Sequence, residues 1–364
     1  FIFSEMNQFD LDLSKFDTSN VKNMSHMFYK NNGIYMLDLS HFNTSNVEDM
    51  SHMFDSCESL ISVDLTSFDT SKVTDMNMMF KDCVSLSSLD LSNFNTKLVI
   101  DMSHMFDDCC SIRTLNLLNF DTSNVKNMSS MFNFTSNIYN LEISSFDTSK
   151  VEDMSNMFYY CHSISNLNID NFDTSQVQDM SNMFYSCNTL ASLNIEKFDT
   201  SNVKNMSGMF KECTLLKKLN VSSFKTDNVL DMSEMFYDCN KVTILDVSNF
   251  KTNNVKNMSG MFDECTSVSS LEVSNFITNE VTDMSRMFRL CQNVRVLNVK
   301  SFNTEKVVNM SGLFQNCKGI KMLDVSNFKT KLVTDMSFMF EECKVTNLNV
   351  SKLETSNGKN MKSM

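Results

Sequence analysis

Three histidines are the residues of this sequence best suited to binding a metal ion. His26, His52 and His104 occupy one position of a recurring Met-Ser-x-Met-Phe motif, and the first two lie 26 residues apart. Imidazole nitrogens bind zinc, but a zinc site needs at least three protein ligands. Other copies of the motif carry Met78 or Ser130 at this position. We therefore expect no metal site and no cofactor.

Cysteine is the second residue type that could carry chemistry. The chain has 12 cysteines, and the zinc spacing C-x-x-C is absent. Eleven cysteines share one repeated position at the end of a predicted helix, where neighbouring helices would lie ~8–10 Å apart, too far for a disulfide. We expect free, buried thiols. The eleven are Cys57, Cys83, Cys109, Cys161, Cys187, Cys213, Cys239, Cys265, Cys291, Cys317 and Cys343; Cys110 is the extra one.

Catalytic motifs are missing from the rest of the chain. No Ser-His-Asp arrangement, glycine-rich phosphate loop or separate pair of acidic residues stands apart from the repeated pattern. We expect no enzymatic activity.

The sequence is built from one repeated unit. Between Leu11 and Cys343 the pattern recurs every 26 residues without a gap, and only the last step is shortened, to 25. A fixed period between 20 and 50 residues is the signature of a solenoid. Fourteen units are marked by a threonine, at Thr18, Thr44, Thr70, Thr96, Thr122, Thr148, Thr174, Thr200, Thr226, Thr252, Thr278, Thr304, Thr330 and Thr355.

Each unit predicts one strand and one short helix. Leu37 and Leu39 flank Asp38 with the period-2 alternation of a half-buried strand. Further along, Met50, Met53-Phe54 and Cys57 have the i, i+3, i+4, i+7 spacing of one helix face. Columns of Phe and Met at 26-residue spacing are expected to fill a continuous core.

The residue before the predicted helix is Asp or Asn in all units. Both side chains are good N-caps, because their oxygen accepts hydrogen bonds from open N–H groups of the first turn. An Asn-Met-Ser such as 23–25 also resembles a glycan acceptor, but a glycan requires Asn. Eight units carry Asp as the predicted cap: Asp49, Asp75, Asp101, Asp153, Asp179, Asp231, Asp283 and Asp335.

An acidic column is the strongest candidate for binding a partner. The residue between the two inward side chains of the strand is acidic in four successive units, at Asp12, Asp38, Asp64 and Asp90. On a parallel sheet these residues form a ladder at strand spacing. The ladder fits either a hydrogen-bonding role that relieves repulsion between strands or a groove for a cation or a basic partner.

Composition and charge narrow the possible partners. The net charge of −13 argues against nucleic acid and against an anionic membrane surface. No apolar run is long enough to span a bilayer, and residues 1–10 lack the features of a signal peptide. Because the sequence begins and ends inside repeats, we expect a fragment of a longer chain.

The repeat resembles a known family. "LISVDLTSFDT" at 60–70 looks like the leucine-rich repeat core, with Phe where the usual Asn stands. The continuation from Met53-Phe54 through Cys57 to Leu60 is similar to the BspA-like branch, and the whole unit resembles the 26-residue repeat of bacterial surface proteins. The last unit departs from the pattern, with Leu353 for Phe and Gly358 for the core Val.

The resemblance implies an α/β solenoid, a right-handed leucine-rich-repeat coil with a concave parallel β-sheet and short convex helices. We expect one solenoid over residues 1–364 with about 14 coils of 26 residues. The family implies display at a cell surface or outside the cell, with adhesion to a protein partner or a host surface. The alternative is a structural spacer or a rod that self-associates end to end.

Overall fold

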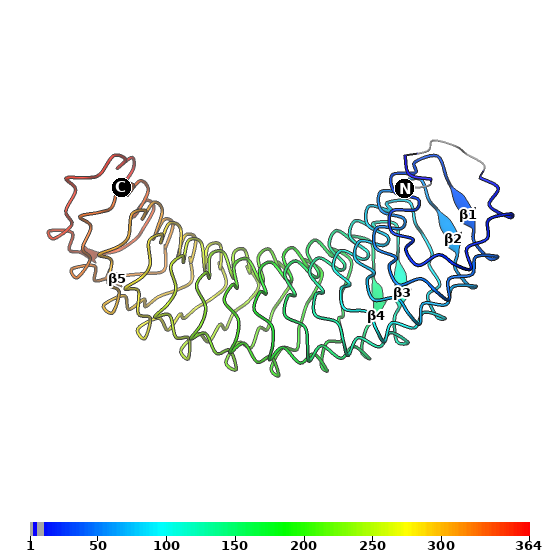
Figure 1. Ribbon diagram of the computed structural model, residues 1–364. Coiled ribbons are helices and arrows are strands. Elements are labelled where there is room, and N and C mark those ends of the chain that lie inside the picture. The colour runs from blue at the N-terminus through cyan, green and yellow to red at the C-terminus, as the bar shows by residue number, and fades with distance from the viewer. Residues whose placement is uncertain (1–2, 6–10) are drawn as a thin grey trace. The chain divides into compact units, whose positions relative to one another are not determined.

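The computed structural model describes residues 3–5 and 11–364, and the chain forms two compact units, residues 1–177 and 178–364. In each unit the chain winds in successive coils that stack on one another (Figure 1). The prediction of a single solenoid over residues 1–364 stays a prediction.

Short parallel strands occupy the positions that the alternating pattern predicts. In the first unit β1 (Met36–Asp38) pairs with β2 (Ser62–Asp64), and β3 (Thr114–Asn116) pairs with β4 (Asn140–Glu142). In the second unit β5 (Met322–Leu323) pairs with β6 (Asn347–Leu348). Each pair joins one coil to the next (Figure 1). The inward apolar side chains are aligned, as in Leu37 with Val63 and Leu115 with Leu141. Within residues 3–5 and 11–364, the predicted parallel sheet is thus present as three two-stranded pairs.

The predicted helices are absent from the described residues, which contain consecutive turns in their place. In the first coil the N–H of Met27 donates to the carbonyl of Met24, and the N–H of Asn31 donates to Phe28. The third residues of these turns, His26 and Lys30, have positive φ angles of 56° and 54°. Two left-handed residues per coil interrupt any α-helix, so the prediction of convex helices was wrong.

Alternate N–H groups of the turns point away from their own coil. His26 and Phe28 donate to the carbonyls of Ser51 and Met53 in the next coil, over 3.1 and 2.9 Å. An α-helix keeps its hydrogen bonds within one segment, whereas these turns satisfy half of theirs only when a second coil lies beside them. The same pattern recurs in both units.

The repeated threonine is a buried connector between coils. The hydroxyl of Thr70, which is 1% exposed, donates to the carbonyl of Asn95 over 2.9 Å and accepts the Asn95 N–H over 2.7 Å. Thr70 itself is buried, and its single hydroxyl is the partner of both backbone groups of Asn95 in the next coil.

Apolar columns fill the interior as the sequence predicts. Successive rings of one Phe column lie parallel, with centroids 5.5 Å apart for Phe28 and Phe54 and 5.8 Å apart for Phe314 and Phe340. The two Met columns are buried beside them. Phe16 is the exception in the other Phe column, because 41% of its surface is exposed.

The cysteine column is buried as free thiols, except for the half-buried Cys343. The Cys57 thiol donates to the carbonyl of Phe28 in the preceding coil over 3.0 Å. Burial raises the pKa of Cys57 and Cys161 to about 12, which keeps these thiols protonated and unreactive. Their role in the fold is therefore that of small core residues.

We expect Thr70→Val to lower the free energy of unfolding by about 1–3 kcal/mol, because it removes a buried hydroxyl that makes two hydrogen bonds to Asn95 of the next coil. Chemical denaturation measures the effect. The matched control is Thr74→Val, which removes an exposed hydroxyl that donates only to the Glu48 carbonyl, and it should change stability by less than about 0.5 kcal/mol. Equal effects at the two positions would contradict the role of the threonine column.

Candidate binding surface

The strand face, meaning the outward side of the strands and their neighbours, carries the predicted acidic column. Asp38 and Asp64 are exposed and lie opposite each other in the β1–β2 pair. One carboxylate oxygen of each is already used, because Asp38 Oδ1 accepts the Ser40 N–H over 2.9 Å and Asp64 Oδ1 accepts the Thr66 N–H over 3.0 Å. Within the described residues, Oδ2 of both makes no hydrogen bond and faces solvent.

Asp12 and Asp90 have the same local geometry outside the named strands. Their Oδ1 atoms accept N–H hydrogen bonds from Ser14 and Ser92, over 3.0 and 2.9 Å. Hydrogen bonds from the residue two positions on lower the pKa of all four carboxyls in the column, Asp12, Asp38, Asp64 and Asp90. The column is therefore fully ionised at neutral pH. Two of its members, Asp38 and Asp64, lie directly opposite each other.

The eight aspartates predicted as caps do accept an N–H, in turns rather than in helices. Asp49 Oδ1 accepts both the N–H and the hydroxyl of Ser51, over 2.9 and 2.7 Å, and its Oδ2 accepts the side-chain amide of Asn23 over 2.8 Å. The other seven carboxylates likewise accept the backbone N–H of the residue two positions later in the sequence. They are Asp75, Asp101, Asp153, Asp179, Asp231, Asp283 and Asp335. These carboxylates therefore fix the entry into the turns.

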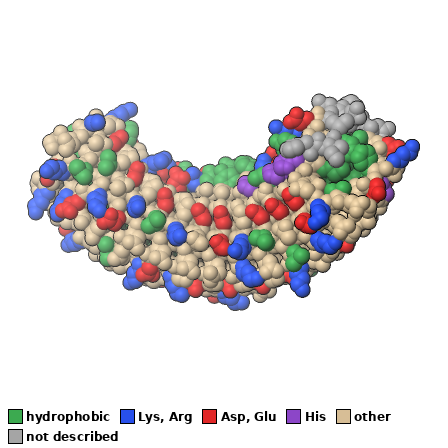
Figure 2. All heavy atoms as spheres, in the orientation of Figure 1, with side chains coloured by type: hydrophobic (Ala, Val, Ile, Leu, Met, Phe, Trp, Pro, Cys, Tyr) green, Lys and Arg blue, Asp and Glu red, His purple; other side chains and the backbone are tan. Residues whose placement is uncertain are grey.

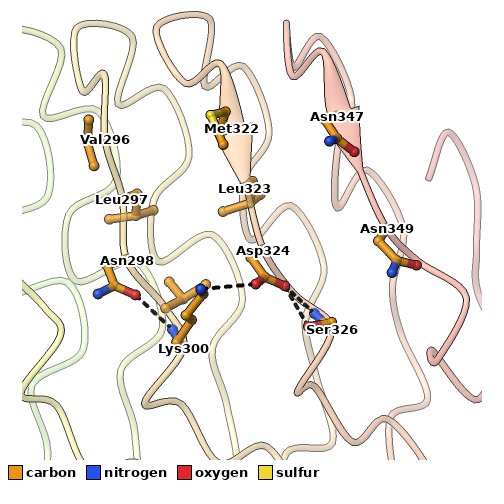
Figure 3. Close-up of a pocket in the computed structure, with 11 residues that line it drawn as sticks. Val296, Leu297, Asn298, Lys300, Met322, Leu323, Asp324, Ser326, Asn347 and Asn349 are labelled. Atoms are coloured by element: carbon orange, nitrogen blue, oxygen red, sulfur yellow. Dashed lines mark hydrogen bonds and ion pairs between the residues drawn. The ribbon is translucent and has the colours of Figure 1, made fainter.

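A groove of about 610 Å³ lies on the strand face of the second unit (Figure 3). Leu297 and Leu323 form its buried floor, while Val296 and Met322 stand out from it with 76% and 74% of their surfaces exposed. The remaining lining residues are Asn298, Val299, Lys300, Asp324, Ser326, Asn347 and Asn349.

Polar groups flank the two exposed apolar side chains of the groove. Lys300 Nζ lies 3.5 Å from Asp324 Oδ2, and Asp324 Oδ1 accepts the N–H and hydroxyl of Ser326 (Figure 3). Asn298 is exposed, and its Oδ1 accepts the Lys300 N–H over 3.2 Å (Figure 3). The groove thus combines apolar contact area with hydrogen-bond donors and acceptors, as interfaces with protein partners do.

Our sequence interpretation missed the exposed apolar residues of the strand face. Four coils carry one immediately before the inward leucine, and each is about three-quarters exposed: Met36, Ile244, Val296 and Met322. The signal was present in the repeat, because other coils place Ser62, Ser192 or Lys218 at this position.

The histidines do not gather around a common site for a metal ion. His26 and His52 stack with ring centroids 4.2 Å apart, and His52 Nδ1 lies 2.7 Å from Asp55 Oδ2. Several histidine side chains lie beside one another in Figure 2 (purple). Across residues 3–5 and 11–364, no group of three or more His, Cys, Asp or Glu side chains could hold a metal ion.

Comparison with known families assigns the chain to one of them. The family model described as "Mycoplasma protein of unknown function, DUF285" matches residues 1–115, 85–192, 188–295 and 269–364. The chain belongs to this family. The match agrees with the resemblance of the repeat to BspA-like leucine-rich repeats. No curated protein matches it.

Three solved bacterial structures are similar to this repeat protein, each at 16% identity. A leucine-rich repeat protein from Bacteroides ovatus matches over 90% of this chain and 88% of its own, with a TM-score of 0.42. One from Eubacterium ventriosum matches over 90% and 87%, with a TM-score of 0.38. A leucine rich cell surface protein from Faecalibacterium prausnitzii matches over 88% and 79%, with a TM-score of 0.33.

In the described part of this family member, no helix is long and apolar enough to cross a membrane.

We expect the Asp64 carboxyl to titrate below its ordinary pKa of 3.8, because the Thr66 hydroxyl and N–H stabilise its charged form. Since the folded pKa is the lower one, this contribution to stability is complete above the unfolded pKa and is lost as the pH falls through the folded pKa. Thr66→Val should return the Asp64 pKa towards 3.8, as measured by NMR titration. The Asp12 pKa, with Ser14 as its partner, should not move, and a shift of both would contradict the local cause.

Proposed function

We propose that this chain is a non-enzymatic protein-interaction module that binds its partner through the strand face. The groove in the second unit is the observation that carries the proposal, because Val296 and Met322 are about three-quarters exposed between polar groups. Burying two such side chains removes apolar surface from water on binding. Met322 lies in β5 and Val296 lies at the equivalent position of the preceding coil, on a backbone that is fixed coil by coil. Little ordering is therefore needed when a partner binds.

Adhesion at a cell surface or outside the cell is the second part of the proposal. Its support is the BspA-like repeat, because the resemblance implies proteins displayed by cells. Treating intact source cells with protease tests this part. Loss of the protein while an internal marker protein survives supports display, and survival of both would refute it.

The acidic column adds a preference for basic partners. Asp38 and Asp64 present two aligned carboxylates whose Oδ2 atoms face solvent, and a Lys or Arg side chain would relieve their repulsion. We also propose Asp12 and Asp90 as outer members of this surface.

A structural rod is the alternative function that one observation favours. Each turn donates backbone N–H groups to the next coil, and a coil of a second copy could accept them in the same way. Light scattering separates the two functions. Growth of end-to-end assemblies with concentration supports the rod, and a monodisperse monomer that binds a partner supports the interaction module.

We expect the double variant Val296→Ser/Met322→Ser to lose most partner binding, by on the order of tenfold or more. Serine occupies this position in other coils, at Ser62 and Ser192, so the fold should tolerate it. Surface capture of the native partner from extracts, quantified at matched protein concentration, measures the loss.

The matched control for this variant is Leu230→Ser/Leu332→Ser. It removes two exposed leucines, 40% and 49% accessible, that lie in the second unit outside the groove. Equal loss of binding in the two double variants would contradict the strand face as the interface.

A further inference from the structure

An exposed aromatic cluster lies in the turns of the first unit, separate from the residues that form the strand face. The Phe134 ring stacks on Tyr160 with centroids 4.9 Å apart and meets the edge of Tyr159 at 5.4 Å. Tyr160 in turn contacts Tyr159 and the ring of His162, at 4.8 and 4.9 Å. Phe134 is 41% exposed, so one large ring of the cluster offers its surface to solvent.

The fold places these rings in one line with two acidic residues. Asp82, Asp108, Phe134 and Tyr160 occupy the same position of four successive coils, and all have positive φ angles between 53° and 59°. The N–H groups of Asp82, Asp108 and Phe134 each donate to the following coil over 2.8 Å. Equivalent backbone positions therefore lie side by side, with carboxylates in two coils and aromatic rings in the next two.

Asp108 is the carboxylate next to the aromatic rings, and the cation that acts on it, Lys81, is paired with Asp82. Its neighbour Asp82 pairs with Lys81 over 2.7 Å, and Asp107 pairs with His104 over 2.7 Å. Asp108 forms no ion pair within the described residues. Partial burial, together with Asp82 and Asp107, raises the Asp108 pKa. A positive charge from outside the chain would relieve this unfavourable position.

Turns in another part of the chain already hold a cation against aromatic rings. In the second unit the Lys211 amino group lies 5.0 Å from the Tyr185 ring and 5.1 Å from the Tyr237 ring. The same amino group pairs with Glu234 over 2.6 Å. In the described residues no Lys or Arg covers the Phe134 ring, although its neighbours Asp108 and Tyr160 repeat this combination of carboxylate and aromatic ring.

We propose that Phe134, Tyr160 and Asp108 form a second docking surface, and that it binds an arginine-containing basic segment of a partner protein. The guanidinium stacks on the exposed Phe134 ring and pairs with the Asp108 carboxylate. Arginine fits better than lysine, since its planar guanidinium can stack and hydrogen-bond to a carboxylate together. The acidic chain, with a net charge of −13, favours the approach of such a segment.

Isothermal titration of the full chain with an arginine–glycine peptide tests the proposal. We expect Phe134→Ser and Asp108→Asn each to weaken binding by roughly tenfold. Both substitutions copy residues that other coils carry at the same position, Ser56 and Asn316, so the variants should fold, and circular dichroism checks this. The matched lysine–glycine peptide should bind the unsubstituted chain more weakly.

A control separates this surface from general attraction by an acidic protein. Asp238→Asn removes the same charge at the equivalent position of another coil. It should leave the affinity within about twofold. The proposal is overturned if the peptide does not bind, if Phe134→Ser binds as well as the unsubstituted chain, or if Asp238→Asn weakens binding as much as Asp108→Asn. The strand-face function is unaffected by these outcomes, because its groove contains none of these residues.

Discussion

Hydrogen bonding between successive coils is the constraint on which the rest of this structure depends. In an α-helix the backbone satisfies itself, but here every second N–H group of the turns finds its acceptor one coil further on. The buried threonine hydroxyls also form hydrogen bonds between successive coils, at another position of the repeat. A coil without a neighbour therefore leaves buried polar groups unpaired, and stability is a property of stacked coils rather than of any one of them.

This constraint also decides which residues are available for function. The backbone and the Phe, Met, Cys and Thr columns are committed to joining coils, so they vary little along the sequence. The side chains at the outward positions of the strands and at the left-handed positions of the turns are not needed to join coils. They differ from coil to coil, as Met322 differs from Ser62 and Phe134 from Ser56. A position whose residue changes from coil to coil therefore indicates a binding surface in this protein. A position that keeps the same residue in every coil indicates a role in the fold.

The period and the buried columns were predictable from the sequence because both follow from the spacing of apolar residues alone. The turns were not. Met50, Met53-Phe54 and Cys57 have helical spacing, and this spacing hides the left-handed residues His52 and Ser56. The signal for positive φ was in other coils, where Gly208, Gly260 and Gly312 take the position of His52. The acidic column was found because four aspartates recur, but the groove was missed because its apolar residues are isolated within a mostly polar column. The choice of partner depends on single residues that differ from the repeat pattern, and a consensus sequence of the repeat does not show them.

Hydrogen exchange of the turn amides tests the role of inter-coil hydrogen bonds most directly. The N–H groups of Phe54 and Phe80 donate only to the next coil, over 2.9 and 3.0 Å. The account predicts that they exchange on the order of a thousandfold or more slowly than the amide of the exposed Lys72, because they open only when the coils separate. Exchange of Phe54 and Phe80 as fast as that of Lys72 would show that the turns open individually, and would contradict the claim that stacked coils hold one another together.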